Sequence, residues 1–165
     1  MNDQATITEE VIAHYLAYQA AVDARDVDGC VGSYVYPYFD IRTRSTQDNP
    51  NLPAAELGEP SMTMMTEEES RTYFAAISAT GRLDPDPSHA TSKASHGMMK
   101  VFPLGQKLAL LLVDNQRMMP DGTVIPESRR RVMYSLQRAG STWKFNGYTV
   151  LDSDFLGPGD IPPFS

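Results

Sequence analysis

The segment KLALLLVDNQRM, residues 107–118, sets the fold class of this 165-residue chain. Its apolar run, Leu108 to Val113, has the length of one strand and is far too short to cross a membrane. Because the run does not alternate between apolar and polar residues, we expect both faces of the strand to be covered. The polar residues that follow, Asp114, Asn115 and Arg117, are typical of a pocket mouth, and equally of a strand that simply reaches water.

Segments on both sides of this strand predict an antiparallel meander. In residues 128–138 apolar residues alternate with charged ones, which places Val132, Tyr134 and Leu136 on the inward face. The remaining strands and turns of the meander are predicted at residues 89–102, with a break or bulge near Gly97, at Pro120-Asp121-Gly122, at Ala139-Gly140-Ser141 and at residues 142–151.

Three helices are predicted in the N-terminal half of the chain. The first is expected to begin at a Thr8 cap and to end near Arg25, with Ile12, Leu16 and Gln19 on its apolar stripe. Glycine, proline and capping residues mark the other two. The second helix is expected from an Asp26 cap to Pro37, and the third from a Thr66–Glu69 capping box to Gly81.

The whole chain, residues 1–165, is predicted to form one α+β domain. Helices that precede a run of antiparallel strands are expected to close one face of a bent sheet. Short strands are expected at residues 38–43 and 61–65, a long loop at residues 44–60, and extended tails at residues 1–7 and 157–165.

Charge and cysteine content limit the classes of partner. The net charge of -7 disfavours nucleic acid, because an acidic surface repels phosphate. The basic run Arg129 to Arg131 is interpreted as an exposed strand edge with one inward exception. The lone Cys30 is expected to be a buried structural thiol, which fits a reducing cytoplasm. No apolar signal segment opens the sequence, so neither secretion nor a membrane partner is expected.

Three segments resemble the nuclear transport factor 2-like superfamily, which includes SnoaL-like polyketide cyclases, ketosteroid isomerase, scytalone dehydratase and a dehydrochlorinase. Residues 18–26 look like the family's opening, an aromatic residue followed by Ala-x-Asp. Residues 34–41 look like the entry to the first strand in one subgroup, and residues 141–145 look like the Gly-x-Trp-Lys-Ile start of the last strand. The similarity spans roughly residues 8–153.

This resemblance implies a cone-shaped fold, in which a strongly curved antiparallel sheet and three helices enclose a pocket. It often implies a dimer, and it implies neither a metal nor a bound organic cofactor. It does not imply one reaction, because the shared fold hosts unrelated chemistries and non-catalytic binders.

Asp23 is the most informative candidate for chemistry. It shares a helix face with Ile12 and Leu16, and a carboxylate on an apolar stripe must be paired or hydrogen-bonded. By resemblance to the dehydrochlorinase, Asp23 would orient His89, which would act as a general base. The alternative is that Asp23 binds a backbone amide or Arg25.

The other histidines have plainer interpretations. His89 and His96 lie seven residues apart on one predicted strand, so they face opposite sides unless a bulge intervenes. At most one of them is therefore expected in the pocket. His14 is expected on the exposed, polar flank of the first helix.

Asp40 lies in the same early region as the carboxylate base of ketosteroid isomerase, although the surrounding motif is absent. Phe39 and Ile41 make the better core pair, which would place Tyr38 and Asp40 on the other face of their strand. Asp40 is therefore not expected in the site.

Further polar groups are expected to line the pocket. Tyr18, Tyr134 and Tyr148 combine a phenol with an apolar body and are predicted to form its walls. Asp114 and Arg117 are predicted at its mouth. The many methionines are typical of ordinary core filling or of an adaptable cavity. No metal-binding cluster, nucleotide fingerprint, phosphate loop or Ser-His-Asp pattern occurs in the sequence.

Two functions follow. The first is a cofactor-independent isomerase, dehydratase or cyclase that abstracts a proton from a small hydrophobic, carbonyl-bearing molecule, with His89 as base and Asp23 as its partner. The second is a non-catalytic ligand-binding or assembly module. In both cases we expect a homodimer through the sheet, because a sheet that is apolar on both faces needs cover on both.

Overall fold

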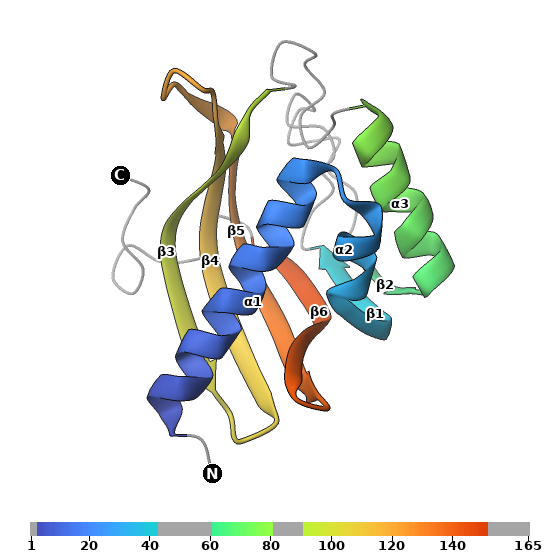
Figure 1. Ribbon diagram of the computed structural model, residues 1–165, viewed down its shortest axis with the longest axis vertical. Coiled ribbons are helices and arrows are strands. Elements are labelled where there is room, and N and C mark those ends of the chain that lie inside the picture. Colours follow the sequence, from blue (N-terminus) through green and yellow to red (C-terminus); the bar gives the residue numbers. More distant parts are fainter. Residues whose placement is uncertain (1–2, 43–60, 81–90, 152–165) are drawn as a thin grey trace.

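The computed structural model describes residues 3–42, 61–80 and 91–151. The order of its helices and strands agrees with the predicted one (Figure 1). The predicted loop at residues 44–60 and the tail at residues 157–165 lie outside the described ranges. The elements are α1 (Gln4–Ala24), α2 (Val27–Gly32), β1 (Tyr34–Arg42), β2 (Ser61–Met65), α3 (Glu67–Thr80), β3 (Lys93–Pro103), β4 (Leu108–Met118), β5 (Val124–Ala139) and β6 (Thr142–Leu151).

The described strands form one curved, open, six-stranded sheet in the order β2-β1-β6-β5-β4-β3. Strands β3 to β6 are the predicted antiparallel meander. β1 pairs in parallel with β6 and antiparallel with β2, so the sheet is mixed rather than purely antiparallel. Parallel neighbours need a long crossover, and here the crossover includes most of the chain. Alternation within single strands does not reveal such a pairing.

α1 begins earlier than predicted. Asp3 accepts a hydrogen bond from the Thr6 N–H at 2.7 Å and caps a helix that starts at Gln4, so residues 4–7 are not an extended tail. Thr8 lies inside the helix, where its hydroxyl donates to the Gln4 carbonyl at 2.8 Å. The end of the helix is where the sequence predicts it, at Arg25, whose φ is 59°.

The buried face of α1 also differs from the predicted stripe. Leu16 is 41% exposed, whereas Tyr15 is fully buried against the sheet. Tyr15 and Tyr18 occupy the buried face of the helix because their rings pack edge-on against aromatic residues of the sheet. The Tyr18 and Phe145 ring centroids, for example, are 5.2 Å apart. Figure 1 shows α1 lying across the sheet, and it packs on β3, β4 and β6. The buried residues of α1 are Ile7, Val11, Tyr15, Tyr18 and Gln19.

α2 is shorter than predicted, and β1 correspondingly longer. Asp26 caps α2 as expected, because its carboxylate accepts from the Gly29 N–H at 2.9 Å. The helix nevertheless ends at Gly32, and Tyr34 to Pro37 already belong to β1. The apolar residues that predicted one helix up to Pro37 are instead divided between a short helix and a strand. The helix ends at Gly32, and Tyr34 is the first residue of β1.

The two faces of β1 are the reverse of those predicted. Tyr38 and Asp40 are buried, at 3% and 8% exposure, while Phe39 is 42% exposed. The physical reason is the aromatic core: the Tyr38 ring lies 4.4 Å from the Tyr34 ring, and Tyr34 packs against Phe145. Asp40 lies two residues after Tyr38, so packing of the Tyr38 ring in the core places the Asp40 side chain on the same inner face.

α3 and the turns agree with the sequence. The Thr66 N–H and hydroxyl both donate to the Glu69 carboxylate at 2.8 Å, and the Glu69 N–H donates to the Thr66 hydroxyl at 3.2 Å. Phe74 on α3 is buried. Gly122 and Gly140 adopt φ of 90° and 64° in the two predicted turns, where residues with a side chain are disfavoured.

The register of β4 and β5 divides their side chains between two faces. Val113 pairs with Val132 and Leu111 with Tyr134 on the inner face, toward α1. The next pair, Asp114 and Arg131, points to the outer face and forms a buried ion pair. Leu111, Leu112 and Val113 are all buried, so this part of β4 is covered on both faces, as its unbroken apolar run predicts.

Burial raises the pKa of the Cys30 thiol to about 12, which makes it the expected inert structural residue. Within the described ranges, no helix combines the length and the apolar character that a membrane span requires.

Candidate functional site

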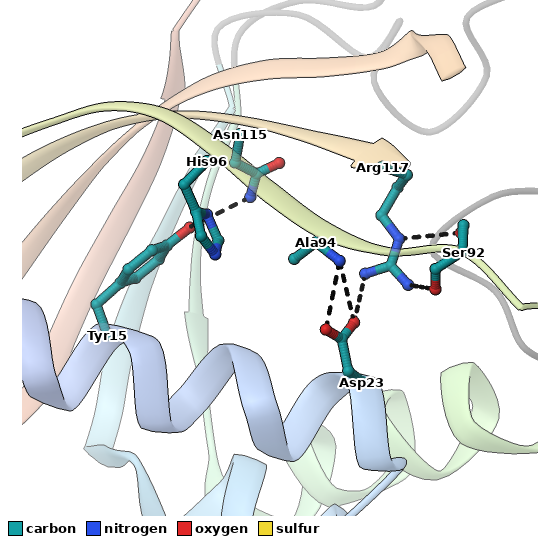
Figure 2. Close-up of polar contacts among 7 residues, drawn as sticks. All are labelled: Tyr15, Asp23, Ser92, Ala94, His96, Asn115 and Arg117. Atoms are coloured by element: carbon teal, nitrogen blue, oxygen red, sulfur yellow. Dashed lines mark hydrogen bonds and ion pairs between the residues drawn. The ribbon is translucent and has the colours of Figure 1, made fainter. Parts of the chain in front are cut away.

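A polar cluster lies between the second half of α1 and the neighbouring ends of β3 and β4. Figure 2 shows Tyr15 reaching from α1 toward His96 on β3 and Asn115 on β4. The Tyr15 hydroxyl is 3.3 Å from His96 Nδ1, and Asn115 Nδ2 is 3.5 Å from the same hydroxyl. The Tyr15 and His96 rings also meet edge-on, with centroids 5.2 Å apart. We call these three residues, Tyr15, His96 and Asn115, the histidine cluster.

Irregular pairing of the strands aims His96 at α1. The β3–β4 register shifts between His96 and Met99, which confirms the bulge predicted near Gly97. His96 pairs with Asn115, so both side chains lie on the inner face together. A second shift, between Asn115 and Arg117, follows on the other side of β4. Bulges are common next to functional sites because they re-aim single side chains.

Asp23 lies beside the histidine cluster, eight residues after Tyr15 on α1. Its Oδ1 forms an ion pair of 2.8 Å with Nη1 of Arg117, and both its oxygens accept from the Ala94 N–H at 3.3 Å (Figure 2). Arg117 also donates from Nε to the Ser92 hydroxyl at 3.2 Å and from Nη2 to the Ser92 carbonyl. We call Asp23 and Arg117, with Ser92 and Ala94, the ion-pair cluster.

The sequence predicted both members of this ion pair, but not that they pair with each other. Of the two alternatives for Asp23, the backbone amide is the one found, and the cation is Arg117 rather than Arg25. The pairing satisfies a carboxylate whose side chain is only 20% exposed. His89 lies outside the described residues, so the Asp23–His89 pair stays a prediction.

His96 has the electrostatic surroundings of a neutral imidazole. Its pKa lies below the ordinary 6.5, mainly because burial disfavours the charged ring, and Asp23 opposes this by raising the pKa. Burial likewise raises the pKa of Tyr15, so its phenol stays protonated. The histidine cluster therefore holds an uncharged hydrogen-bonding chain at neutral pH.

The predicted tyrosine walls are part of the aromatic core. Tyr18 and Tyr134 are buried, and their pKa values are raised well above 10 by burial. Tyr134 lies 5.4 Å from the Tyr15 ring and stacks on Tyr148 at 6.1 Å. Tyr134 thus adjoins the histidine cluster, with Tyr148 behind it. Whether they line a pocket stays a prediction.

Asp114 is not brought to this site. It precedes Asn115 in β4, so its side chain points to the opposite face of the sheet. There Asp114 pairs with Arg131 through Oδ2 and Nη2 at 2.7 Å, and the two side chains are only 4% and 6% exposed. Its burial and its partner give it a structural role.

Sequence reasoning assigned no role to Tyr15 or His96, and it indicated Asn115 only as one of the polar residues, with Asp114 and Arg117, that end the apolar strand. The signal for Asn115 was present, because Val113, Asn115 and Arg117 alternate on one face of a strand. The signal for Tyr15 was its spacing of eight residues from Asp23, which is about two helical turns. His14 is also half-buried rather than exposed: its Nε2 donates to the Ser33 carbonyl at 3.1 Å. Burial lowers the His14 pKa.

The described residues hold no group of three or more histidine, cysteine or acidic side chains with the geometry to bind a metal ion. The side-chain groups of the two clusters are instead a phenol, an amide, an imidazole, a hydroxyl and a guanidinium that is already paired with a carboxylate. Such a set suits the binding of polar groups on a small organic molecule and the transfer of a proton.

Comparison with known proteins identifies the fold. No protein-family model matches the chain, and no curated protein matches it. Among solved structures, an NTF2-like protein of unknown function from Pseudomonas putida has a TM-score of 0.61 at 13% identity, covering 90% of this chain and 88% of the other. A domain of unknown function with a cystatin-like fold from Nostoc punctiforme has a TM-score of 0.61 at 14% identity, covering 93% and 82%.

A third similar structure, an NTF-2 like protein of unknown function from Shewanella oneidensis, has a TM-score of 0.58 at 10% identity. The alignment covers 88% of this chain and 98% of the other. At such identities the likeness establishes the fold and leaves the activity open. The chain therefore has the NTF2-like α+β fold that its sequence resembles.

Proposed function

We propose that this chain binds a small, hydrophobic, carbonyl-bearing molecule and acts on it by proton transfer at His96, without a cofactor. The observation that carries the proposal is the position of His96, half-buried and with a lowered pKa, hydrogen-bonded through Nδ1 to Tyr15 beside the charged pair of Asp23 and Arg117. A neutral imidazole in such surroundings is a suitable general base near pH 7. The free, buried Cys30 is compatible with the cytoplasmic location that we propose.

The hydrogen bonds of the cluster suggest how the base is oriented. When Nδ1–H of His96 donates to the Tyr15 hydroxyl oxygen, Nε2 carries a lone pair and accepts the proton from the carbon next to the carbonyl group. The electron pair of that C–H bond moves into the carbonyl, which gives an enolate. The imidazolium then returns the proton to another carbon in an isomerase, to a departing hydroxyl group in a dehydratase, or to the oxygen of a second carbonyl that the enolate carbon attacks in a cyclase. Asp23 favours the transient imidazolium, because its charge raises the His96 pKa.

Exchange of α-protons tests this proposal without knowledge of the natural substrate. β-Tetralone, a hydrophobic cyclic ketone, is incubated with the full chain in D2O, and deuterium uptake is followed by NMR. We expect exchange above the rate given by free imidazole at the same concentration. His96→Gln should lower the protein-dependent rate about 100-fold or more, which is the usual contribution of a general base.

His89→Gln tests the alternative base, because His89 is the histidine that the resemblance makes the partner of Asp23. We expect it to keep the wild-type rate. If instead His89→Gln abolishes exchange and His96→Gln does not, the base is His89, and the Asp23–His89 pair is the better account. If wild-type protein binds the ketone but exchanges no proton, the chain is a non-catalytic binding module.

A second candidate, an assembly role, rests on the outer face of the sheet. The register places Phe39 opposite Met64, and Ile41 opposite Met62, on this face of β1 and β2. Phe39, Met62 and Met64 are 42%, 67% and 48% exposed. Neighbouring exposed apolar side chains of this size are typical of an interaction surface. We therefore propose a homodimer through the outer face of the sheet.

The dimer is tested by sedimentation velocity at micromolar concentration. Wild-type protein should sediment as a dimer, and Met62→Glu with Met64→Glu should sediment as a monomer, because two carboxylates would be buried at the interface. Leu16→Glu, at an exposed apolar position on α1, is the control and should remain dimeric. A monomeric wild-type chain excludes the dimer and leaves the proposed chemistry untouched.

A further inference from the structure

We propose that Arg117 is a positioning residue, which holds the Asp23 carboxylate against the start of β3 and thereby keeps His96 free of an acidic hydrogen-bond partner. The use of His96 as a base rests on the proposed function. The charge arrangement itself does not, and it is measured independently below.

The contacts of Arg117 support a fixed position. Its guanidinium bonds to Asp23 Oδ1 at 2.8 Å, to the Ser92 hydroxyl at 3.2 Å and to the Ser92 carbonyl, and its side chain is only 13% exposed. A guanidinium is planar and presents its donors in a fixed fork, so several contacts at once define its orientation. Arg117 therefore joins the end of α1 to the beginning of β3.

Asp23 is held against the strand that carries His96. Its carboxylate accepts from the Ala94 N–H at 3.3 Å, and Ala94 precedes His96 by two residues in β3. Asp23 thus lies near enough to His96 for an electrostatic interaction, and it raises the His96 pKa against the larger effect of burial.

Among the described residues, the titratable groups that contact His96 or act on its pKa are Tyr15 and Asp23, both on α1. On β4, Asn115 is neutral and Arg117 pairs with Asp23. Without Arg117, Asp23 would be a largely buried carboxylate without its cation. A buried carboxylate without a cation favours a new positive charge nearby, and protonation of His96 would supply one. Protonated His96 could no longer accept a proton from a substrate.

The experiment is an NMR titration of the three histidine side chains in the 165-residue chain. Long-range proton–nitrogen spectra are recorded from pH 5 to pH 9, and the His96 signals are assigned by their loss in His96→Gln. Wild type, Asp23→Asn, Arg117→Gln and Arg117→Lys are compared. Circular dichroism melting checks that each variant is folded.

The proposal predicts an order of His96 midpoints. Relative to wild type, the midpoint should move to lower pH in Asp23→Asn and to higher pH in Arg117→Gln. Arg117→Lys keeps the cation and should stay close to wild type. If Arg117→Gln does not fold, Asp23→Asn and Arg117→Lys still decide, because an unchanged midpoint in Asp23→Asn shows that Asp23 does not act on His96.

Other outcomes overturn the proposal. A midpoint in Arg117→Gln that equals or falls below the wild-type value contradicts it, and so does an equal upward shift in Arg117→Gln and Arg117→Lys, which would indicate a structural effect only. The titration is independent of turnover. Failure of wild-type protein to exchange ketone protons removes the proposed function, whereas a wrong order of midpoints removes only the role of Arg117.

Discussion

Asp23 and Arg117, 94 positions apart in the sequence, form an ion pair of 2.8 Å that joins the end of α1 to the end of β4. Both side chains are largely withdrawn from water, at 20% and 13% exposure. Breaking the pair is therefore expected to cost more than breaking a surface ion pair, whose contribution is usually below about 1 kcal/mol. It also fixes the start of β3, on which His96 lies.

Breaking this pair should destabilise the fold measurably. We expect Asp23→Asn and Arg117→Met each to lower the free energy of unfolding by about 1–3 kcal/mol, because each leaves a poorly solvated partner. The double variant should lose less than the sum of the two. Urea unfolding of all four proteins gives the coupling energy, and strict additivity would show that the two side chains do not interact.

The buried pair on the outer face of the sheet should be more sensitive still. Asp114→Asn is expected to cost about 3–5 kcal/mol, because it leaves the Arg131 guanidinium charged and buried. Replacing both, with Asp114→Leu and Arg131→Met, should recover much of that loss. Equal losses for the single and double variants in thermal or urea unfolding would contradict this account.

Acid should destabilise the fold through its histidines. Burial lowers the pKa values of His14 and His96 below 6.5. As the pH falls below 6.5, the unfolded chain binds protons that the folded chain does not, so stability decreases until the folded pKa is reached. We expect His14→Gln to flatten this decrease while keeping the donor to the Ser33 carbonyl. The measurement is the urea midpoint of unfolding between pH 7.5 and pH 5. If the midpoint depends on pH equally in wild type and His14→Gln, His14 does not contribute to the acid sensitivity.

Tyr15→Phe separates orientation of the base from packing. The variant keeps the ring that packs against His96 and Tyr134 and removes only the hydroxyl. We expect stability to change by less than about 1 kcal/mol, and ketone exchange to slow about 2- to 10-fold, as for one lost hydrogen bond. Full wild-type exchange in Tyr15→Phe would remove the hydroxyl from the mechanism.

Local signals in the sequence predicted most of the elements. The capping box at Thr66 and Glu69, the Gly122 and Gly140 turns and the bulge near Gly97 each depend on residues close together in the chain. The structure confirms these predictions because the chemistry that stabilises them is local. The prediction of the start of α1 was wrong because Asp3 and Thr8 are both suitable N-cap residues. Packing of Ile7 in the core favours the helix that begins after Asp3.

The site was less predictable because its contacts are not local. Tyr15 and His96 are 81 positions apart, and Asn115 and Tyr15 are 100 apart. The orientation of His96 depends on a bulge in β3. The alternation of apolar and polar residues does not show at which residue of the strand this bulge lies. The error in β1 has the same origin: Tyr38 and Asp40 are buried because Tyr34 and Phe145 pack on that side, and this is a tertiary preference.

The most direct measurement is a crystal structure of the protein soaked with β-tetralone. The account predicts the ketone between α1 and β3, with its carbonyl group or the adjacent carbon about 3 Å from His96 Nε2, within reach for proton transfer. A ketone bound on the outer face of the sheet, or bound beyond contact with His96, would contradict the proposed site.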